Sequence, residues 1–98
     1  MELKVAVVGA TGNVGREMLN ILHERNFPAK EVAAIASRRS QGTEVSYGDK
    51  TLKTQALEHY DFSHTHICLM SAGGQVAKEW APKIAAQGCV VIDNSSAW

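Results

Sequence analysis

A valine-rich run that leads into three evenly spaced glycines is the feature that most constrains the fold of this chain. Residues 5–8 read VAVV, and Gly9, Gly12 and Gly15 follow in the string GATGNVG. Such a run is typical of a strand covered on both faces of a parallel sheet. The glycines allow a sharp turn, a close approach of a pyrophosphate and a tightly packed helix, in that order. The spacing predicts a dinucleotide site, and a purely structural turn is the alternative.

Composition limits the remaining possibilities. The chain has 98 residues, of which 45% are hydrophobic and 20% charged, as expected for one small globular domain or a piece of a larger one. Ten basic and ten acidic residues cancel, and without a basic tract we expect neither a nucleic-acid partner nor a membrane surface. With no membrane-spanning run and no signal-peptide layout, we expect a cytoplasmic protein. Cys68 and Cys89 each lie in an apolar run and are expected as buried free thiols.

The hydrophobic pattern predicts an α/β chain. It gives strands over residues 3–8, 31–36, 67–70 and 89–93, helices over 13–25 and 75–87, and an antiparallel hairpin over 45–54. We therefore expect a doubly wound (Rossmann-like) parallel sheet with helices on both faces and a small hairpin insert. Pro82 predicts a kink or a restart of the second helix, and Gly88 is its expected C-terminal cap. The side chains expected to face the sheet are Val14, Met18, Ile21 and Leu22, with Leu19 beside them, and in the second helix Val76, Trp80 and Ile84, with Ala77 as a further candidate.

Four loops follow the predicted strands and should meet at one edge of the sheet, where doubly wound folds bind ligands. They cover residues 9–14, 37–42, 71–74 and 93–96, and all are built of small or hydrogen-bonding residues. The third loop, SAGG, is either a second cradle for the cofactor or only a turn. The candidate cofactor contacts in the four loops are Gly9, Thr11, Gly12, Asn13, Val14, Ser37, Arg38, Arg39, Ser40, Ser71, Ala72, Gly73, Asn94 and Ser95.

The second loop distinguishes between cofactors. Domains selective for NAD place an acidic residue at the end of the second strand, about 20 residues past the glycine turn, to bind the ribose 2′-hydroxyl. Here Ser37, Arg38, Arg39 and Ser40 occupy that position. Guanidinium groups and hydroxyls suit a 2′-phosphate, so the loop favours NADP, although paired arginines are also common on plain surfaces. His64 and His66 lack a third ligand nearby, so we predict no metal site.

Four motifs in this order, GATGNVG, SRRSQG, SAGG and DNSSAW, resemble those of the bacterial aspartate-semialdehyde dehydrogenases. The resemblance runs over the whole chain. N-acetyl-γ-glutamyl-phosphate reductase shares the glycine turn but not usually the last two strings, and it remains an alternative. The resemblance implies NADP-dependent reduction of L-aspartyl-4-phosphate to L-aspartate-4-semialdehyde, a step toward diaminopimelate, lysine, methionine and threonine.

The resemblance also implies roles for individual residues. Residues 11–14 would hold the pyrophosphate, and residues 38–40 the 2′-phosphate. Residues 71–73 would border the adenine ribose and pyrophosphate, and Asn94 and Ser95 would approach the nicotinamide.

The family's catalytic cysteine, active-site histidine and substrate-binding arginines lie beyond residue 98, so no catalytic residue is assigned here. We thus expect residues 1–98 to be a truncated NADP-binding domain that is inactive alone. The full-length enzyme is expected to be a homodimer that takes a small-molecule substrate. A non-catalytic NADP-sensing domain is the competing interpretation, and a domain that binds nothing well in isolation is a third.

Overall fold

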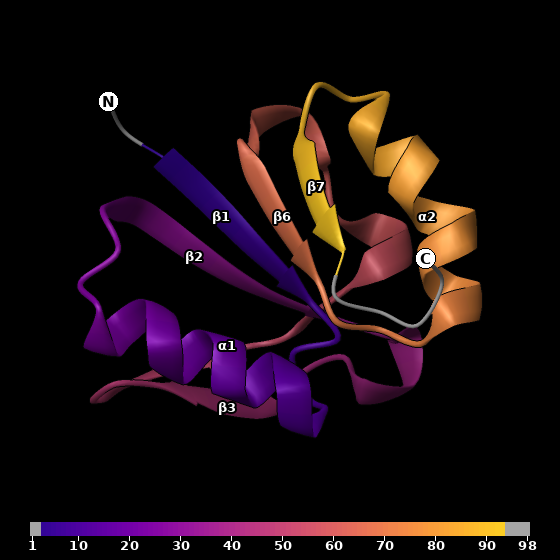
Figure 1. The fold of residues 1–98 in the computed structure, drawn as a ribbon. Helices are drawn as coiled ribbons and strands as arrows, with labels where there is room; N and C mark the ends of the chain where they lie inside the picture. The colour runs from indigo at the N-terminus through magenta and orange to yellow at the C-terminus, as the bar shows by residue number, and fades with distance from the viewer. Residues whose placement is uncertain (1–2, 94–98) are drawn as a thin grey trace.

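The computed structural model of the chain describes residues 3–93, which alternate between strands and helices (Figure 1). The strands are β1 (Leu3–Val8), β2 (Ala29–Ala36), β3 (Glu44–Tyr47), β4 (Lys50–Lys53), β5 (Gln55–Ala56), β6 (Ile67–Met70) and β7 (Val90–Asp93). The α-helices are α1 (Asn13–Glu24) and α2 (Gly74–Ala85), and the 3-10 turns are η1 (Arg38–Ser40), η2 (Leu57–His59) and η3 (Phe62–His64).

Five of the strands form one parallel sheet, in the order β5-β2-β1-β6-β7. β3 and β4 pair in antiparallel fashion as a separate hairpin, as the sequence predicts. The expected doubly wound fold is therefore confirmed. One strand was not expected: β5 has only two residues, which pair with Ile35 and Ala36 of β2. A segment of two residues has no periodicity, so only its pairing with β2 reveals it as a strand.

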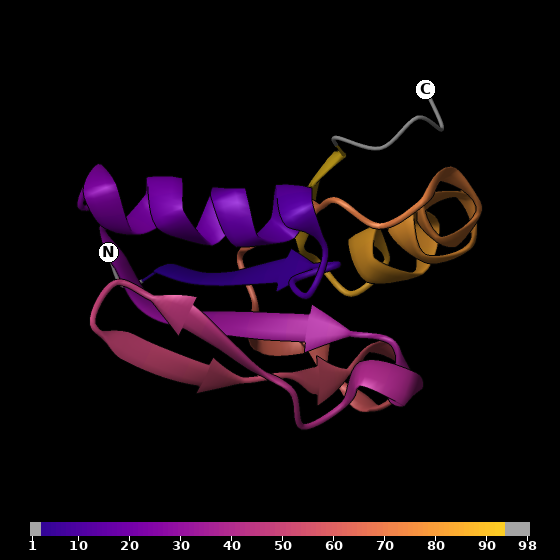
Figure 2. The same ribbon diagram turned by 90° about the horizontal axis from the view of Figure 1, so that it is seen from below.

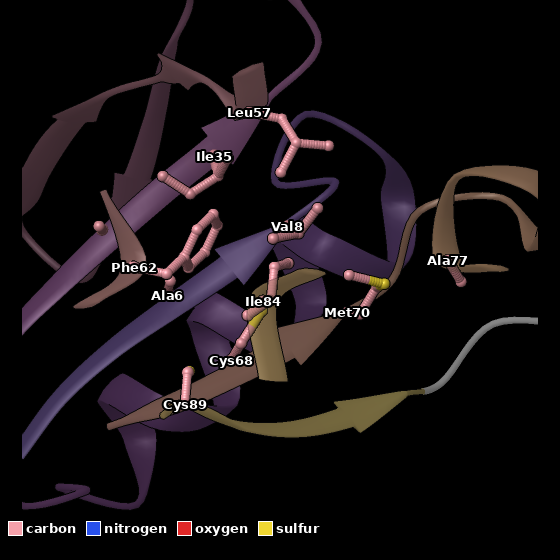
Figure 3. Close-up of a cluster of buried hydrophobic side chains, with 11 residues drawn as sticks. Ala6, Val8, Ile35, Leu57, Phe62, Cys68, Met70, Ala77, Ile84 and Cys89 are labelled. Atoms are coloured by element: carbon pink, nitrogen blue, oxygen red, sulfur yellow. The ribbon is translucent and has the colours of Figure 1, made fainter. Parts of the chain in front are cut away.

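Each face of the sheet carries its own apolar cluster. On one face Leu19 and Leu22 of α1 pack against Val5 and Val7 of β1, and the hairpin adds Val45. Figure 2 shows α1 running along β1 on this side. The other cluster lies under α2, and its members include Ala6, Val8, Ile35, Phe62, Cys68, Met70, Ala77 and Ile84 (Figure 3). These two layers hold β1 at the centre of the molecule, where burial of apolar area stabilises the fold most.

The face of α1 that packs on the sheet differs from the prediction. The buried residues are Gly15, Leu19 and Leu22, whereas Val14 is 47% exposed and Ile21 41% exposed. Two sets of residues recur at helical spacing: the predicted set is 14, 18, 21 and 22, and the observed set is 15, 19 and 22. Periodicity alone therefore does not choose between the two faces. Gly15, which has no Cβ, packs directly against the backbone of Gly9 and Ala10 just after β1, and this contact turns Val14 and Ile21 away from the sheet.

Helix α2 does not restart at Pro82, because the helix continues from Gly74 to Ala85. Proline has no amide donor of its own, but its carbonyl still accepts, and the amide of Ala86 donates to the Pro82 carbonyl at 3.0 Å. The helix ends two residues earlier than predicted. Gly88 lies in the turn that follows, at φ 93°. Ala77 and Ile84 are the buried side chains of α2, while Val76 is exposed rather than facing the sheet.

Candidate dinucleotide site

Three of the four predicted loops meet at the carboxyl edge of the sheet. The amides of Gly9 and Ala10 donate to the carbonyl of Ile35 at 2.9 and 3.1 Å, which ties the first loop to the end of β2. The amide of Ser71 donates to the Val8 carbonyl at 2.9 Å and ties the third loop to the end of β1. β2 lies on one side of β1 and β6 on the other, so the strand order reverses here, as it does at the binding crevice of doubly wound sheets.

The fourth loop begins at the same edge, since Asp93 of β7 pairs with Met70 of β6. Asn94 and Ser95, the two candidate contacts of that loop, lie outside the described residues.

Two glycines of the first loop are required by the fold itself. Gly9 has φ +86°, and a Cβ there would lie 2.9 Å from both the Ala72 amide nitrogen and Ser71 Oγ. A Cβ on Gly15 would overlap the carbonyl oxygen of Gly9. The turn and the close approach of α1 to β1 thus exclude any side chain at these two positions.

The other two glycines in the loops at this edge have room beside them for a side chain. A Cβ on Gly12 would meet only the Gly9 carbonyl oxygen, at 3.5 Å, and a Cβ on Gly73 would have no neighbour within 4 Å. Packing within residues 3–93 therefore does not explain why these positions are glycine. Bare backbone on two facing loops fits a ligand that lies against it, as a pyrophosphate does.

The first turn of α1 points its amides toward this edge. Gly12 is the N-cap and has no side chain to bond those amides, and the first turn contains no acidic residue. Such a helix start presents unpaired amides and the positive end of the helix dipole to an anion. Arg16 adds a guanidinium, because its Nε donates to the Thr11 carbonyl at 3.1 Å. Arg16 was not among the predicted site residues, although a basic residue in the first turns of the helix was a signal for it.

The second loop forms the short turn η1. The Ser40 amide donates to the Ser37 carbonyl at 2.9 Å, and the Ser40 carbonyl accepts from Thr54 Oγ1 at 2.8 Å. Thr54 is only 2% exposed, so this bond attaches the loop to a buried position after β4. Arg38 and Arg39 are exposed, and Arg38 lines an open depression of about 710 Å³ together with Lys53 and His59. The end of β2 therefore presents several basic groups.

Between the three loops lies a smaller cleft of about 290 Å³. Four predicted site residues line it: Gly9, Thr11, Ser37 and Ala72. Leu57, Glu58, Val76 and Trp80 also line it, and the sequence pattern did not place them there. Ser71 is occupied within the protein, since its Oγ donates to the Val8 carbonyl at 2.9 Å.

The two cysteines are buried free thiols, as predicted. Burial, with a smaller contribution from Cys89, raises the pKa of Cys68 to about 12. Burial also raises the pKa of Cys89 above its usual value. Neither thiol forms a thiolate near neutral pH, so neither is suited to act as a nucleophile.

A parallel sheet with a bare glycine turn, an uncapped helix start and a cleft between adjacent strand ends defines a dinucleotide-binding domain. The chain belongs to the semialdehyde dehydrogenase family: residues 4–98 match the family model described as "Semialdehyde dehydrogenase, NAD binding domain".

The relatives of this chain are longer than it is. It is 55% identical over 92 residues to the aspartate-semialdehyde dehydrogenase of Rickettsia conorii, covering 94% of this chain and 27% of that protein. The crystal structure of aspartate semialdehyde dehydrogenase II from Vibrio cholerae, complexed with ASA, superposes with a TM-score of 0.93 at 47% identity, covering 98% of this chain and 31% of that one. The crystal structure of aspartate semialdehyde dehydrogenase with NADP from Candida albicans shares the fold, with a TM-score of 0.78 at 23% identity, and the match covers 99% of this chain and 30% of that one. The chain thus spans about a third or less of these relatives.

Neither helix within residues 3–93 has the length and apolar character needed to cross a membrane.

Proposed function

We propose that this chain is the cofactor-binding domain of an NADP-dependent aspartate-semialdehyde dehydrogenase. The proposal rests on the 55% identity between this chain and an enzyme of that name, in an alignment that covers 94% of this chain. The proposed reaction of the complete enzyme reduces L-aspartyl-4-phosphate with NADPH and a proton, and yields L-aspartate-4-semialdehyde, phosphate and NADP. The hydride comes from the cofactor when it is bound. The residues of this chain bind and orient that cofactor, and residues 1–98 do not turn over substrate alone.

The proposed contacts follow the geometry of the strand ends. The first-turn amides of α1 and the bare backbone at Gly12 hold the pyrophosphate, with Arg16 bracing the loop through Thr11. Arg38, Arg39 and Ser40 bind the 2′-phosphate, and Ala72 and Gly73 border the cofactor from the third loop. Asn94 and Ser95 remain proposed contacts on the nicotinamide side.

The preference for NADP over NAD rests on the end of β2. Ala36 and Ser37 stand where a carboxylate would bind the ribose 2′-hydroxyl of NAD, and η1 presents two exposed guanidinium groups instead. A 2′-phosphate forms charge-assisted hydrogen bonds with guanidinium groups, whereas a 2′-hydroxyl gains little from them.

A thermal-shift titration with NADP and NAD side by side tests the proposal. NADP at about 100 times its dissociation constant should add roughly 2.7 kcal/mol to the free energy of unfolding. NAD at the same concentration should add much less. The double variant Arg38→Gln/Arg39→Gln should weaken NADP binding by about tenfold or more and leave NAD binding nearly unchanged.

Arg25→Gln is the matched control, because Arg25 follows α1 at the opposite end of that helix. Equal stabilisation by the two cofactors would contradict the role of η1, and no stabilisation by either would contradict cofactor binding by this chain.

The proposal extends to the setting of the complete enzyme. We expect it to act in the cytoplasm on a small-molecule substrate, as a homodimer, without nucleic-acid or membrane partners. The even balance of basic and acidic residues supports the last point.

A further inference from the structure

A further pocket lies at the opposite edge of the sheet, where the parallel strands begin. Its volume is about 390 Å³, and it is lined by Lys4, Lys30, Ser63, His64, Thr65, His66 and Gly88. These residues come from the starts of β1 and β2 and from the segments that lead into β6 and β7. Figure 1 shows the arrows of the sheet pointing away from this edge. The length of β1 separates the pocket from the glycine turn by about 15–20 Å, so it is distinct from the dinucleotide site.

The charged groups that line this amino-edge pocket are all basic. Two lysines and two histidines line it, Ser63 and Thr65 add hydroxyl groups, and none of the described lining residues is acidic. A metal ion is a poor ligand for such a set, because ammonium groups repel a cation. Within residues 3–93 no group of three His, Cys, Asp or Glu side chains could hold a metal ion. The lining therefore suits an anion that accepts several hydrogen bonds.

His66 is held in place with one nitrogen available as a donor. The Lys4 amide donates to its Nδ1 at 3.0 Å. A ring nitrogen that accepts carries no proton, so Nε2 carries the proton of the neutral imidazole. The backbone of His66 is bonded on both sides, because its amide donates to the Lys4 carbonyl and its carbonyl accepts from the Val90 amide, each at 2.9 Å. These three bonds fix the ring between the starts of β1 and β7, so a ligand gains this donor at little cost in ordering.

Lys4 has an ion-pair partner that a ligand can replace. Its Nζ lies 3.5 Å from Glu31 Oε2, and the two side chains are 38% and 60% exposed. Ion pairs this exposed to solvent contribute little to stability. An anion with two negative charges would therefore compete well with the single carboxylate of Glu31 for the ammonium group.

We propose that the amino-edge pocket binds a phosphate group, with Lys4 and Lys30 balancing its charge and His66 Nε2 donating a hydrogen bond. The phosphate group belongs either to inorganic phosphate or to a small phosphorylated molecule. Pockets for small molecules run from roughly 300 to 1,000 Å³, so this one also has room for a small organic body attached to the phosphate. The site goes beyond the proposed function, since it lies at the other end of the strands from the cofactor.

NMR titration of the isotope-labelled chain with inorganic phosphate and with glycerol 3-phosphate tests the proposal. Chloride keeps the ionic strength constant, and each titration is run with and without NADP. The amides of Lys4, Lys30 and residues 63–66 and the Nε2 proton of His66 should show saturable shifts, and NADP should leave the affinity unchanged. Equal affinity for the two compounds would identify the phosphate ion as the ligand, and tighter binding of the ester would identify a phosphorylated small molecule.

A double lysine variant tests the assigned residues. Lys4→Gln/Lys30→Gln should weaken phosphate binding by about tenfold or more, because charge-assisted hydrogen bonds are lost. Lys50→Gln/Lys78→Gln is the matched control: it makes the same change in net charge at two exposed positions outside the pocket, and it should bind phosphate as the wild type does.

Two results would overturn the inference while leaving the proposed function intact. Shifts that do not saturate, or that weaken equally in both double variants, would show that the basic groups only balance the carboxyl ends of α1 and α2, which lie at this edge. Displacement of phosphate by NADP would place the anion in the dinucleotide site instead. Failure to bind NADP would count against the proposed function alone.

Discussion

At the scale of the residue, the evenly spaced positions of the first loop are occupied by glycine for different physical reasons. Gly15 is required because the Gly9 carbonyl occupies the place of a Cβ. Gly12 has φ −80° and ψ 169°, which any residue adopts, and an added Cβ would make only an ordinary contact. The spacing in the sequence is regular, yet the fold demands Gly15 and tolerates a side chain at Gly12.

Substitution of these two glycines should separate folding from binding. Gly15→Ala should lower the free energy of unfolding by about 1–3 kcal/mol, because overpacking against backbone exceeds the gain in helix propensity. Gly12→Ala should change it by less than about 1 kcal/mol but weaken NADP binding by about tenfold or more, since the methyl group lies where the pyrophosphate approaches. Urea unfolding and NADP titration measure the two effects. A Gly12→Ala variant that binds NADP normally would contradict a pyrophosphate at this turn.

At the scale of the element, η1 depends on a hydrogen bond from outside its own segment. The turn contains only three residues and has no buried side chain, so packing does little to fix it. Thr54, just after β4, reaches back to the Ser40 carbonyl and is itself buried. The hairpin therefore positions the loop that carries the two arginines.

Thr54→Val should loosen this loop while it preserves the shape of the buried side chain. We expect the free energy of unfolding to fall by about 1 kcal/mol, the usual net value of a hydrogen bond. The preference for NADP over NAD should fall as well, because Arg38 and Arg39 lose their fixed support. Thr51→Val, at an exposed position of β4, is the control and should alter neither quantity. A cofactor preference unchanged in Thr54→Val would show that η1 is held by other contacts.

At the scale of the whole molecule, one face of the sheet is only partly covered. Val90 and Ile92 of β7 pair with Ile67 and Leu69 of β6, which lie on the α1 side of the sheet. α1 covers β1 but leaves Val90 61% and Ile92 52% exposed. β7 is also an edge strand of the described sheet, and an exposed apolar edge favours association with another chain.

Ile92→Glu should reduce concentration-dependent self-association of residues 1–98. The substitution places a charge on the exposed apolar surface and should change the free energy of unfolding by no more than about 0.5 kcal/mol. Light scattering over a concentration series measures the effect, and Ile92→Val is the control that keeps the surface apolar. A wild-type chain that stays monomeric at high concentration would contradict this expectation.

The sequence by itself determined the fold class and the location of the site. Runs such as residues 3–8 and 67–70 have the length and composition of buried parallel strands, and parallel strands bring their carboxyl ends to one edge wherever the helices pack. The three loops that meet there were therefore predictable from order along the chain.

Only the tertiary structure decided the rest. Periodicity allows two faces of α1, and contact at Gly15 selects one of them. β5 exists only through its pairing with β2, and that pairing brings Leu57 and Glu58 into the cleft beside Trp80. Such contacts join residues far apart in the chain, and no local pattern encodes them.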